Sequence, residues 1–85
     1  MKLLFTRTFV RDYRSLPAEI QKLIDKQLGR LLADPRHLSL NVKKMKDPRA
    51  IWEARITGSH RFTFQISNDT YILRKAGPHD ILKKP

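Results

Sequence analysis

Residues 51–66 read IWEARITGSHRFTFQI, and apolar and polar side chains alternate on both sides of a short polar stretch. Because successive side chains of a strand point to opposite faces, this alternation predicts two strands that each have one apolar face. The stretch between them, residues 57–60, has the composition of a turn. The apolar face would carry Trp52, Ala54, Ile56, Phe62, Phe64 and Ile66, and the polar face Glu53, Arg55, Arg61, Thr63 and Gln65.

The register of this hairpin follows from the same alternation. Pairing residues whose numbers sum to 116 keeps apolar opposite apolar, and it places Arg55 beside Arg61. A shift of one residue would mix the two faces. Two adjacent arginines repel each other, so the pair suits either a surface neutralised by Glu53 and Asp69 or a surface that holds an anion.

A third strand follows a second turn at residues 67–70. Tyr71 and Leu73 return to the apolar face, and the strand ends at Gly77-Pro78, just before His79. Continuing the alternation predicts that the outer, cationic face also carries Ile72, Arg74 and Ala76.

The first half of the chain has helical periodicity. Residues 3–5 are predicted to form a short strand. Thr6 or Thr8 can then cap a first helix. Pro17 suits the first turn of a second helix, which ends at Asp34-Pro35. Residues 35–50 contain two prolines and many charges, and are expected to form a loop. The apolar stripes are Phe9, Val10, Tyr13 and Leu16 in the first helix, and Ile20, Leu23, Ile24, Leu28, Leu31 and Leu32 in the second.

This order of elements predicts a two-layer α+β fold, in which two N-terminal helices pack on a small antiparallel sheet. At 85 residues, the chain is expected to be one domain over residues 1–85. Both helices should cover the apolar face of the sheet and leave the cationic face open.

The formal net charge of +10 makes a polyanion the expected partner. Most of the excess lies in residues 35–85, with 11 Lys and Arg against 4 Asp and Glu, on segments predicted to fold. There is no cysteine, and three scattered histidines make a poor metal set, so neither a metal nor an organic cofactor is expected. The N-terminus resembles neither a signal peptide nor a membrane span, and we expect a cytoplasmic location.

The order of elements, together with Trp52-Glu53-Ala54-Arg55-Ile56, His60-Arg61 and His79, resembles the RelE/ParE toxin superfamily over nearly the whole chain. The likeness is greater to the branch of RelE and YoeB. The resemblance implies a βααβββ toxin that cuts mRNA on the ribosome. It also implies a cognate antitoxin that silences the toxin, in a homodimer or a toxin-antitoxin hetero-oligomer.

The resemblance also implies roles for individual residues. Arg61 would contact the scissile phosphate, and His79 would act as general acid or base. Lys46 or Glu53 would carry the remaining proton transfer or support it electrostatically. The residues expected to hold RNA phosphates are Lys43, Lys44, Arg55 and Arg74.

Other interpretations stay open at this point. Residues 80–85 contain no tyrosine, which RelE and YoeB toxins usually carry there, and the loop before Trp52 has lysines where YoeB-like toxins have a glutamate. The chain could therefore be a ParE-like inhibitor of DNA gyrase, or a degenerate module that binds RNA or an acidic partner without cutting. His79 alone could also be an ordinary surface histidine, and His60 and His37 are expected to be turn and loop residues.

Overall fold

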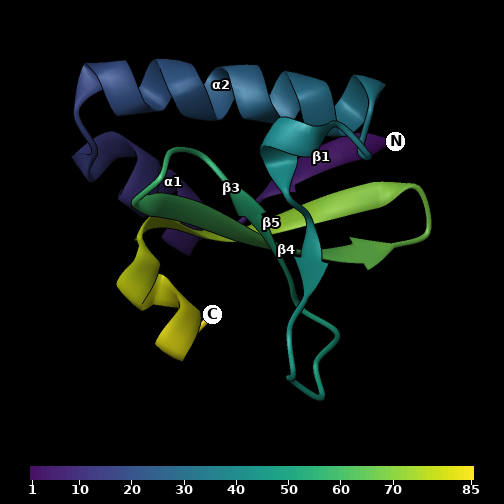
Figure 1. The fold of residues 1–85 in the computed structure, drawn as a ribbon. Coiled ribbons are helices and arrows are strands. Elements are labelled where there is room, and N and C mark those ends of the chain that lie inside the picture. Colours follow the sequence, from purple (N-terminus) through teal and green to yellow (C-terminus); the bar gives the residue numbers. More distant parts are fainter.

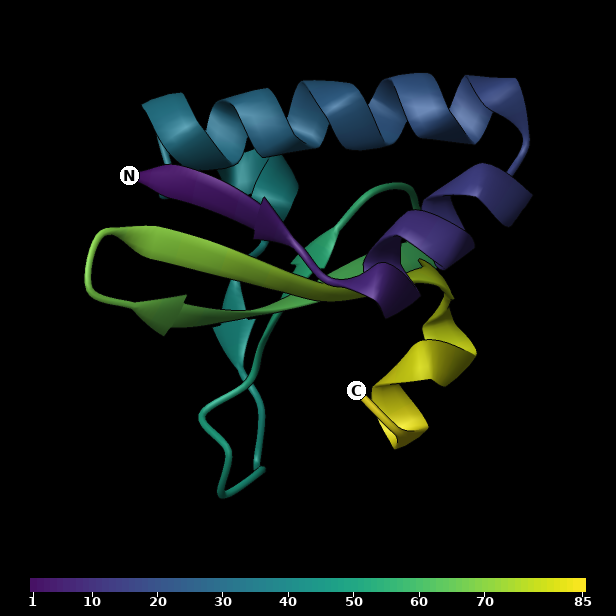
Figure 2. The same ribbon diagram turned by 180° about the vertical axis from the view of Figure 1, so that it is seen from behind.

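One five-stranded sheet in the order β1-β5-β4-β3-β2 organises the fold of this computed structural model, which describes residues 1–85. Helix α2 lies along one side of the sheet, whereas the loop after β2 and the C-terminal segment extend on the other side (Figures 1 and 2). The elements are β1 (Lys2–Phe5), α1 (Arg7–Ser15), α2 (Ala18–Ala33), the 3-10 turn η1 (Leu38–Leu40), β2 (Lys43–Lys44), β3 (Trp52–Arg55), β4 (His60–Ser67), β5 (Thr70–Pro78) and the 3-10 segment η2 (His79–Lys83).

The predicted two-layer α+β fold is confirmed, but the sheet is wider than expected. Residues 35–50 were predicted to be a loop, yet they contain η1 and the short edge strand β2. At the other edge, β1 runs parallel to β5, so the sheet is mixed and only mostly antiparallel. No helix has the length and apolar character needed to cross a membrane.

Helix α1 begins at the predicted cap. The Thr6 hydroxyl accepts a hydrogen bond from the Phe9 amide at 3.2 Å and donates one to the Leu73 carbonyl at 2.8 Å. One side chain therefore satisfies a free amide of the first helical turn and ties that turn to β5. A second link comes from the Asp12 carboxylate, which accepts from the Ala76 amide at 3.1 Å. These bonds hold α1 against β5.

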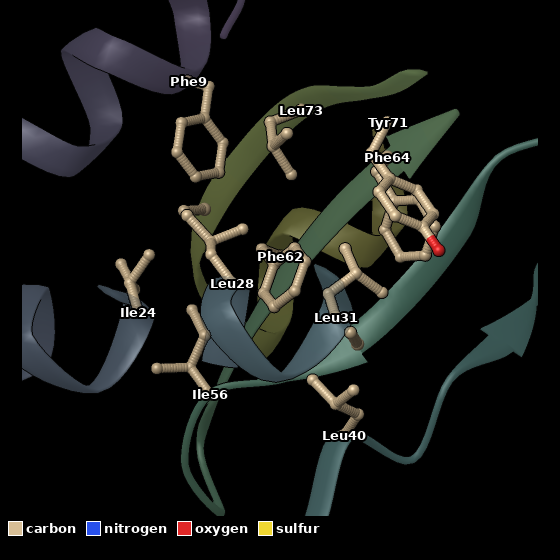
Figure 3. Packing of buried hydrophobic residues seen from close by; sticks show 12 residues of the cluster. Phe9, Ile24, Leu28, Leu31, Leu40, Ile56, Phe62, Phe64, Tyr71 and Leu73 are labelled. Atoms are coloured by element: carbon tan, nitrogen blue, oxygen red, sulfur yellow. The ribbon is translucent and has the colours of Figure 1, made fainter. Parts of the chain in front are cut away.

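The core lies between α2, α1 and the apolar face of the sheet (Figure 3). Phe64 and Tyr71 meet edge to face, with ring centroids 5.5 Å apart. Three predicted core positions are instead exposed, two on α2 and one near the end of β4; these are Leu23, Leu32 and Ile66. The fully covered side chains include Phe9, Ile24, Leu31, Phe62, Phe64 and Leu73.

The predicted hairpin register is confirmed. Ala54 pairs with Phe62, Trp52 with Phe64, and Arg55 with Arg61. The next turn is the two-residue connection Asn68-Asp69, and Asn68 adopts a φ of 53°, a left-handed conformation that asparagine tolerates better than most residues.

The prediction for Ala76 is wrong. Thr63 pairs with Lys75, but Phe64 pairs with Leu73, so β5 contains one extra residue, Arg74, at this point. A bulge of one residue reverses the alternation beyond it. Ala76 therefore pairs with Phe62 and lies in the core, and Lys75 takes a place on the outer face.

Candidate functional site

Arg61 is the residue for which the structure departs most from expectation. It lies on the outer face of β4, as predicted, but only 9% of its surface is exposed. Its Nη1 donates to the carbonyls of Thr57 at 2.7 Å and His60 at 2.9 Å, so the side chain folds back on the hairpin turn. A third carbonyl, that of Gly58, accepts at 3.3 Å. The prediction of an open, solvated arginine is therefore wrong.

The other edge of the same guanidinium is free. Nε and Nη2 of Arg61 have no partner within the chain, and neither is a buried unsatisfied atom, so this edge reaches the surface. A guanidinium edge of this kind matches two oxygens of a phosphate or carboxylate. The turn carbonyls thus fix the orientation of a group that can still receive an anion.

His79 lies at the same corner of the molecule, although 18 residues separate it from Arg61 in the sequence. Its backbone amide donates to the Ser59 carbonyl at 2.9 Å, and in the β4–β5 ladder Arg61 pairs with Gly77. The side chain of His79 is exposed and makes no hydrogen bond within the chain. The structure therefore places a free imidazole at the turn that anchors Arg61.

His60 has the structural role that its position predicted. Its Nδ1 is 3.1 Å from the Thr57 hydroxyl and 3.1 Å from the Ser59 hydroxyl. His37 likewise has a local structural role, because its Nδ1 accepts a hydrogen bond from the Ser39 amide at the start of η1. Only His79 has both ring nitrogens without a partner within the chain.

Arg55 is exposed and stands beside Arg61 in the ladder. The carboxylates that could have neutralised the two arginines do not do so, because Asp69 pairs with Lys2 at 3.8 Å and Glu53 makes no ion pair. The surface around the hairpin therefore carries two positive charges without a compensating carboxylate, which favours the binding of an anion.

The three loop lysines do not form one cluster. Lys43 pairs with Glu53 on the outer face of the sheet. Lys44 pairs with Trp52, and its Nζ lies 5.9 Å from the centre of the indole ring, so it belongs to the opposite face. Lys46 is exposed in the loop beyond β2. Of the three lysines, only Lys43 is held by the sheet on its outer face, where it pairs with Glu53.

The loop after β2 is held by Asp47 and Arg49. Nε and Nη2 of Arg49 donate to the two carboxylate oxygens of Asp47 at 3.0 and 2.7 Å, and the Arg49 amide donates at 2.8 Å. These hydrogen bonds lower the pKa of Asp47 to about 2. Ala50 then turns the chain back toward β3 with a φ of 56°, in the left-handed region. The loop that carries Lys46 therefore has a defined shape.

We expect this loop to loosen only in strong acid. Because the pKa of Asp47 is lowered in the folded protein, the stabilising contribution of its ion pair is present above pH 4 or so and is lost as the pH falls toward about 2. NMR would follow the Arg49 amide, which should titrate with a midpoint near 2 in the wild type and not at all in Asp47→Asn. A midpoint near that of an ordinary aspartate would contradict the ion pair.

The C-terminal segment crosses part of the face that was predicted to be open. The Pro85 carbonyl accepts from the Thr63 hydroxyl and from Nε of Arg74, both at 3.2 Å. Nη1 of Arg74 donates to Gln65 at 3.0 Å, and Gln65 in turn donates to the Arg49 carbonyl at 2.9 Å. Arg74 is thus engaged within the chain through Nε and Nη1, and its contact with an RNA phosphate stays a prediction.

Comparisons with known proteins identify the class of fold. No protein-family model matches the chain. A solved RelB-RelE antitoxin-toxin complex from Methanococcus jannaschii contains a chain that is 26% identical, with a TM-score of 0.75 and coverage of 94% of both chains. YafQ from Escherichia coli has the same fold at only 8% identity, with a TM-score of 0.79 over 95% of this chain and 96% of that one. The fold is that of small bacterial and archaeal toxins.

A sequence relative gives the family. The curated toxin RelE3 of Methanocaldococcus jannaschii is 34% identical over 80 residues, which cover 88% of this chain and 86% of that protein. The chain therefore belongs to the RelE/ParE superfamily of toxins, as its residues suggested.

Proposed function

We propose that the protein is an endoribonuclease that cuts mRNA on the ribosome and so inhibits translation. The observation that carries this proposal is the corner formed by Arg61 and His79. The turn carbonyls anchor one end of the Arg61 guanidinium, its other edge has no partner within the chain, and the backbone of His79, whose exposed imidazole makes no hydrogen bond, is bonded to Ser59 of the same turn. These are groups that cleavage of an RNA backbone requires.

The cleavage step needs a 2′-hydroxyl to attack the adjacent phosphorus while the bond to the 5′-oxygen breaks. In our proposal, Arg61 takes up the charge that develops on the phosphoryl oxygens. His79 gives a proton to the departing 5′-oxygen, and Glu53 or Lys46 assists removal of the proton from the 2′-hydroxyl. The upstream product would end in a 2′,3′-cyclic phosphate and the downstream product in a 5′-hydroxyl.

Neighbouring cations would hold the rest of the RNA. Arg55 stands next to Arg61 without an ion pair, and Lys43 lies on the outer face two ladder positions away, beside Glu53. Such contacts position the strand and make binding sensitive to salt. We place this activity in the cytoplasm, where ribosomes translate.

A ParE-like inhibitor of gyrase is the competing function, because the same superfamily includes ParE toxins. Two assays separate the possibilities. Purified protein should cut mRNA in a reconstituted translation reaction and leave DNA supercoiling by gyrase unchanged. Loss of supercoiling with intact mRNA would favour gyrase, and RNA binding without either effect would favour a module that only binds.

A groove lies beside α1, and we further propose that an antitoxin covers it. Solved structures with this fold include RelB-RelE complexes of an antitoxin with its toxin. The groove has a volume of about 350 Å³ and is mainly apolar, with Phe5 of the edge strand β1 and Val10 of α1 in its wall. An adjoining hollow shares Phe5 and Val10 and is lined by Arg7, Arg11 and Arg14. An amphipathic acidic segment complements such a surface.

Reversing one of these charges should weaken the antitoxin complex. Arg14→Glu places a carboxylate at the groove and is expected to raise the Kd for the cognate antitoxin by about tenfold or more. Isothermal titration would measure it, with Arg36→Glu as a control that makes the same charge change on an exposed loop residue. Equal effects of the two variants would show that the groove is not the docking site.

A further inference from the structure

A second cationic hollow, separate from the groove beside α1, lies between α2 and the β3–β4 hairpin. Its volume is about 200 Å³, and nine residues line it. Three of these residues are cations, Lys26, Arg30 and Arg55, and none is a carboxylate. Concave surfaces that gather like charges are places where an anion can lower the repulsion between them.

The wall of this hollow is built around a buried glutamine. Gln27 is 4% exposed, and its amide donates to the carbonyls of Arg55 at 2.8 Å and Ser39 at 3.2 Å. Its side-chain oxygen accepts from Nη1 of Arg30 at 3.1 Å, and the same Nη1 donates to the Ser39 hydroxyl at 2.8 Å. A fully satisfied buried network of this kind holds its members in place. It joins α2, η1 and β3, so the hollow is preformed.

No ion pair within the chain neutralises the positive charges of the residues that line the hollow. The three ion pairs of the molecule involve other residues, and the side chains of Lys26 and Arg55 make no hydrogen bond at all. Arg30 uses only Nη1, so the edge formed by its Nε and Nη2 is free, as it is in Arg61. One exposed cation, Lys26, and one anchored guanidinium edge thus lie on the α2 side of the hollow. By contrast, Arg55 offers its backbone carbonyl to Gln27 and pairs with Arg61 on the outer face of the sheet.

The hollow shares the hairpin turn with the site of Arg61. Thr57 and Gly58 line the hollow, and their carbonyls are the groups that accept from Arg61. One turn therefore separates two places that suit a phosphate. We propose that the hollow between α2 and the hairpin binds a backbone phosphate of the same RNA strand whose scissile phosphate lies at Arg61. This inference rests on the proposed function and adds a contact outside the cleavage site.

Binding of an RNA that cannot be cut tests the hollow independently of catalysis. We would measure the Kd of a short single-stranded 2′-O-methyl oligoribonucleotide by fluorescence anisotropy as a function of salt. Lys26→Gln should reduce the slope of log affinity against log salt by about 0.7 and weaken binding about fivefold at about 0.1 M salt, the values for one lost phosphate contact. Lys22→Gln is the matched control, since it removes the same charge one turn away on α2, outside the hollow.

The outcomes separate this inference from the nuclease proposal. Lys26→Gln should fold, because the Lys26 side chain makes no hydrogen bond or ion pair in the wild type, and thermal unfolding would verify it. If Lys26→Gln changes the slope no more than Lys22→Gln, the phosphate site is overturned even where the wild type cuts mRNA. If the slope falls as expected but mRNA stays intact, the phosphate site stands and the nuclease proposal fails. A selective loss of binding to the cognate antitoxin in Lys26→Gln, with unchanged RNA affinity, would assign the hollow to a protein partner and overturn the inference.

Discussion

Arg61→Ala is expected to slow cleavage of ribosome-bound mRNA by about 10²-fold or more, the usual cost of removing a principal group that stabilises transition-state charge. Arg61→Lys should be nearly as poor. A lysine cannot donate to the turn carbonyls and present a second, planar edge to a phosphate at the same time. Single-turnover rates at saturating protein would report the chemical step.

The Arg61 variants need a control for folding, because Nη1 of Arg61 also holds the hairpin turn. Its loss should destabilise the protein by about 1 to 3 kcal/mol, as for other hydrogen bonds from charged groups. Rates are therefore compared at a temperature where unfolding curves show each variant to be folded. Arg36→Ala, on an exposed loop residue, serves as the charge control. A rate within a few fold of the wild type for Arg61→Ala would exclude it as the phosphate clamp.

His79→Ala is expected to slow the same reaction by about 10²-fold, the scale of general acid catalysis. The turn histidine offers a comparison within the same corner, because the ring of His60 is bonded to two turn hydroxyls. We expect His60→Ala to change stability more than the rate. His79→Gln, which keeps a polar side chain but cannot pass a proton at this step, should be as slow as His79→Ala.

A modified substrate identifies the proton that His79 would supply. When sulfur replaces the 5′-oxygen at the scissile bond, the leaving group needs no proton, so a missing general acid costs little. His79→Ala should then cut this RNA nearly as fast as the wild type does. Arg61→Ala should stay slow, because charge still develops on the phosphoryl oxygens. An equal defect of His79→Ala on both substrates would rule out the role of general acid at that oxygen.

Much of the fold could be predicted because it depends on local patterns. The alternation of residues 51–66 has one register that buries the apolar side chains, and that register is present. The cap at Thr6 depends on its neighbours along the chain. The bulge at Arg74 interrupts the alternation, since Arg74 and Lys75 are consecutive charged residues and unbroken alternation would turn Lys75 toward the core, but the prediction continued the alternation through them. Ala76 is small enough to suit either face, so its position was misassigned.

The site was harder to predict because it depends on contacts between distant segments. The sequence placed Arg61 on the outer face, but the turn carbonyls that bind it become acceptors only once the hairpin closes. Lys43 and Lys44 looked like one cluster, yet neighbours in a strand must lie on opposite faces. Lys26 and Arg30 lie on the helix that covers the core, and the sequence did not indicate that they share a hollow with the turn of the β3–β4 hairpin.

The most direct test of the proposed activity is the chemistry of the RNA ends. An mRNA translated by purified ribosomes would be exposed to the protein, and its cuts mapped by primer extension with analysis of the terminal groups. We expect cuts confined to ribosome-bound mRNA, with a 2′,3′-cyclic phosphate upstream and a 5′-hydroxyl downstream of each cut. Intact mRNA in the presence of folded protein free of its antitoxin, or cuts that leave a 5′-phosphate, would contradict it.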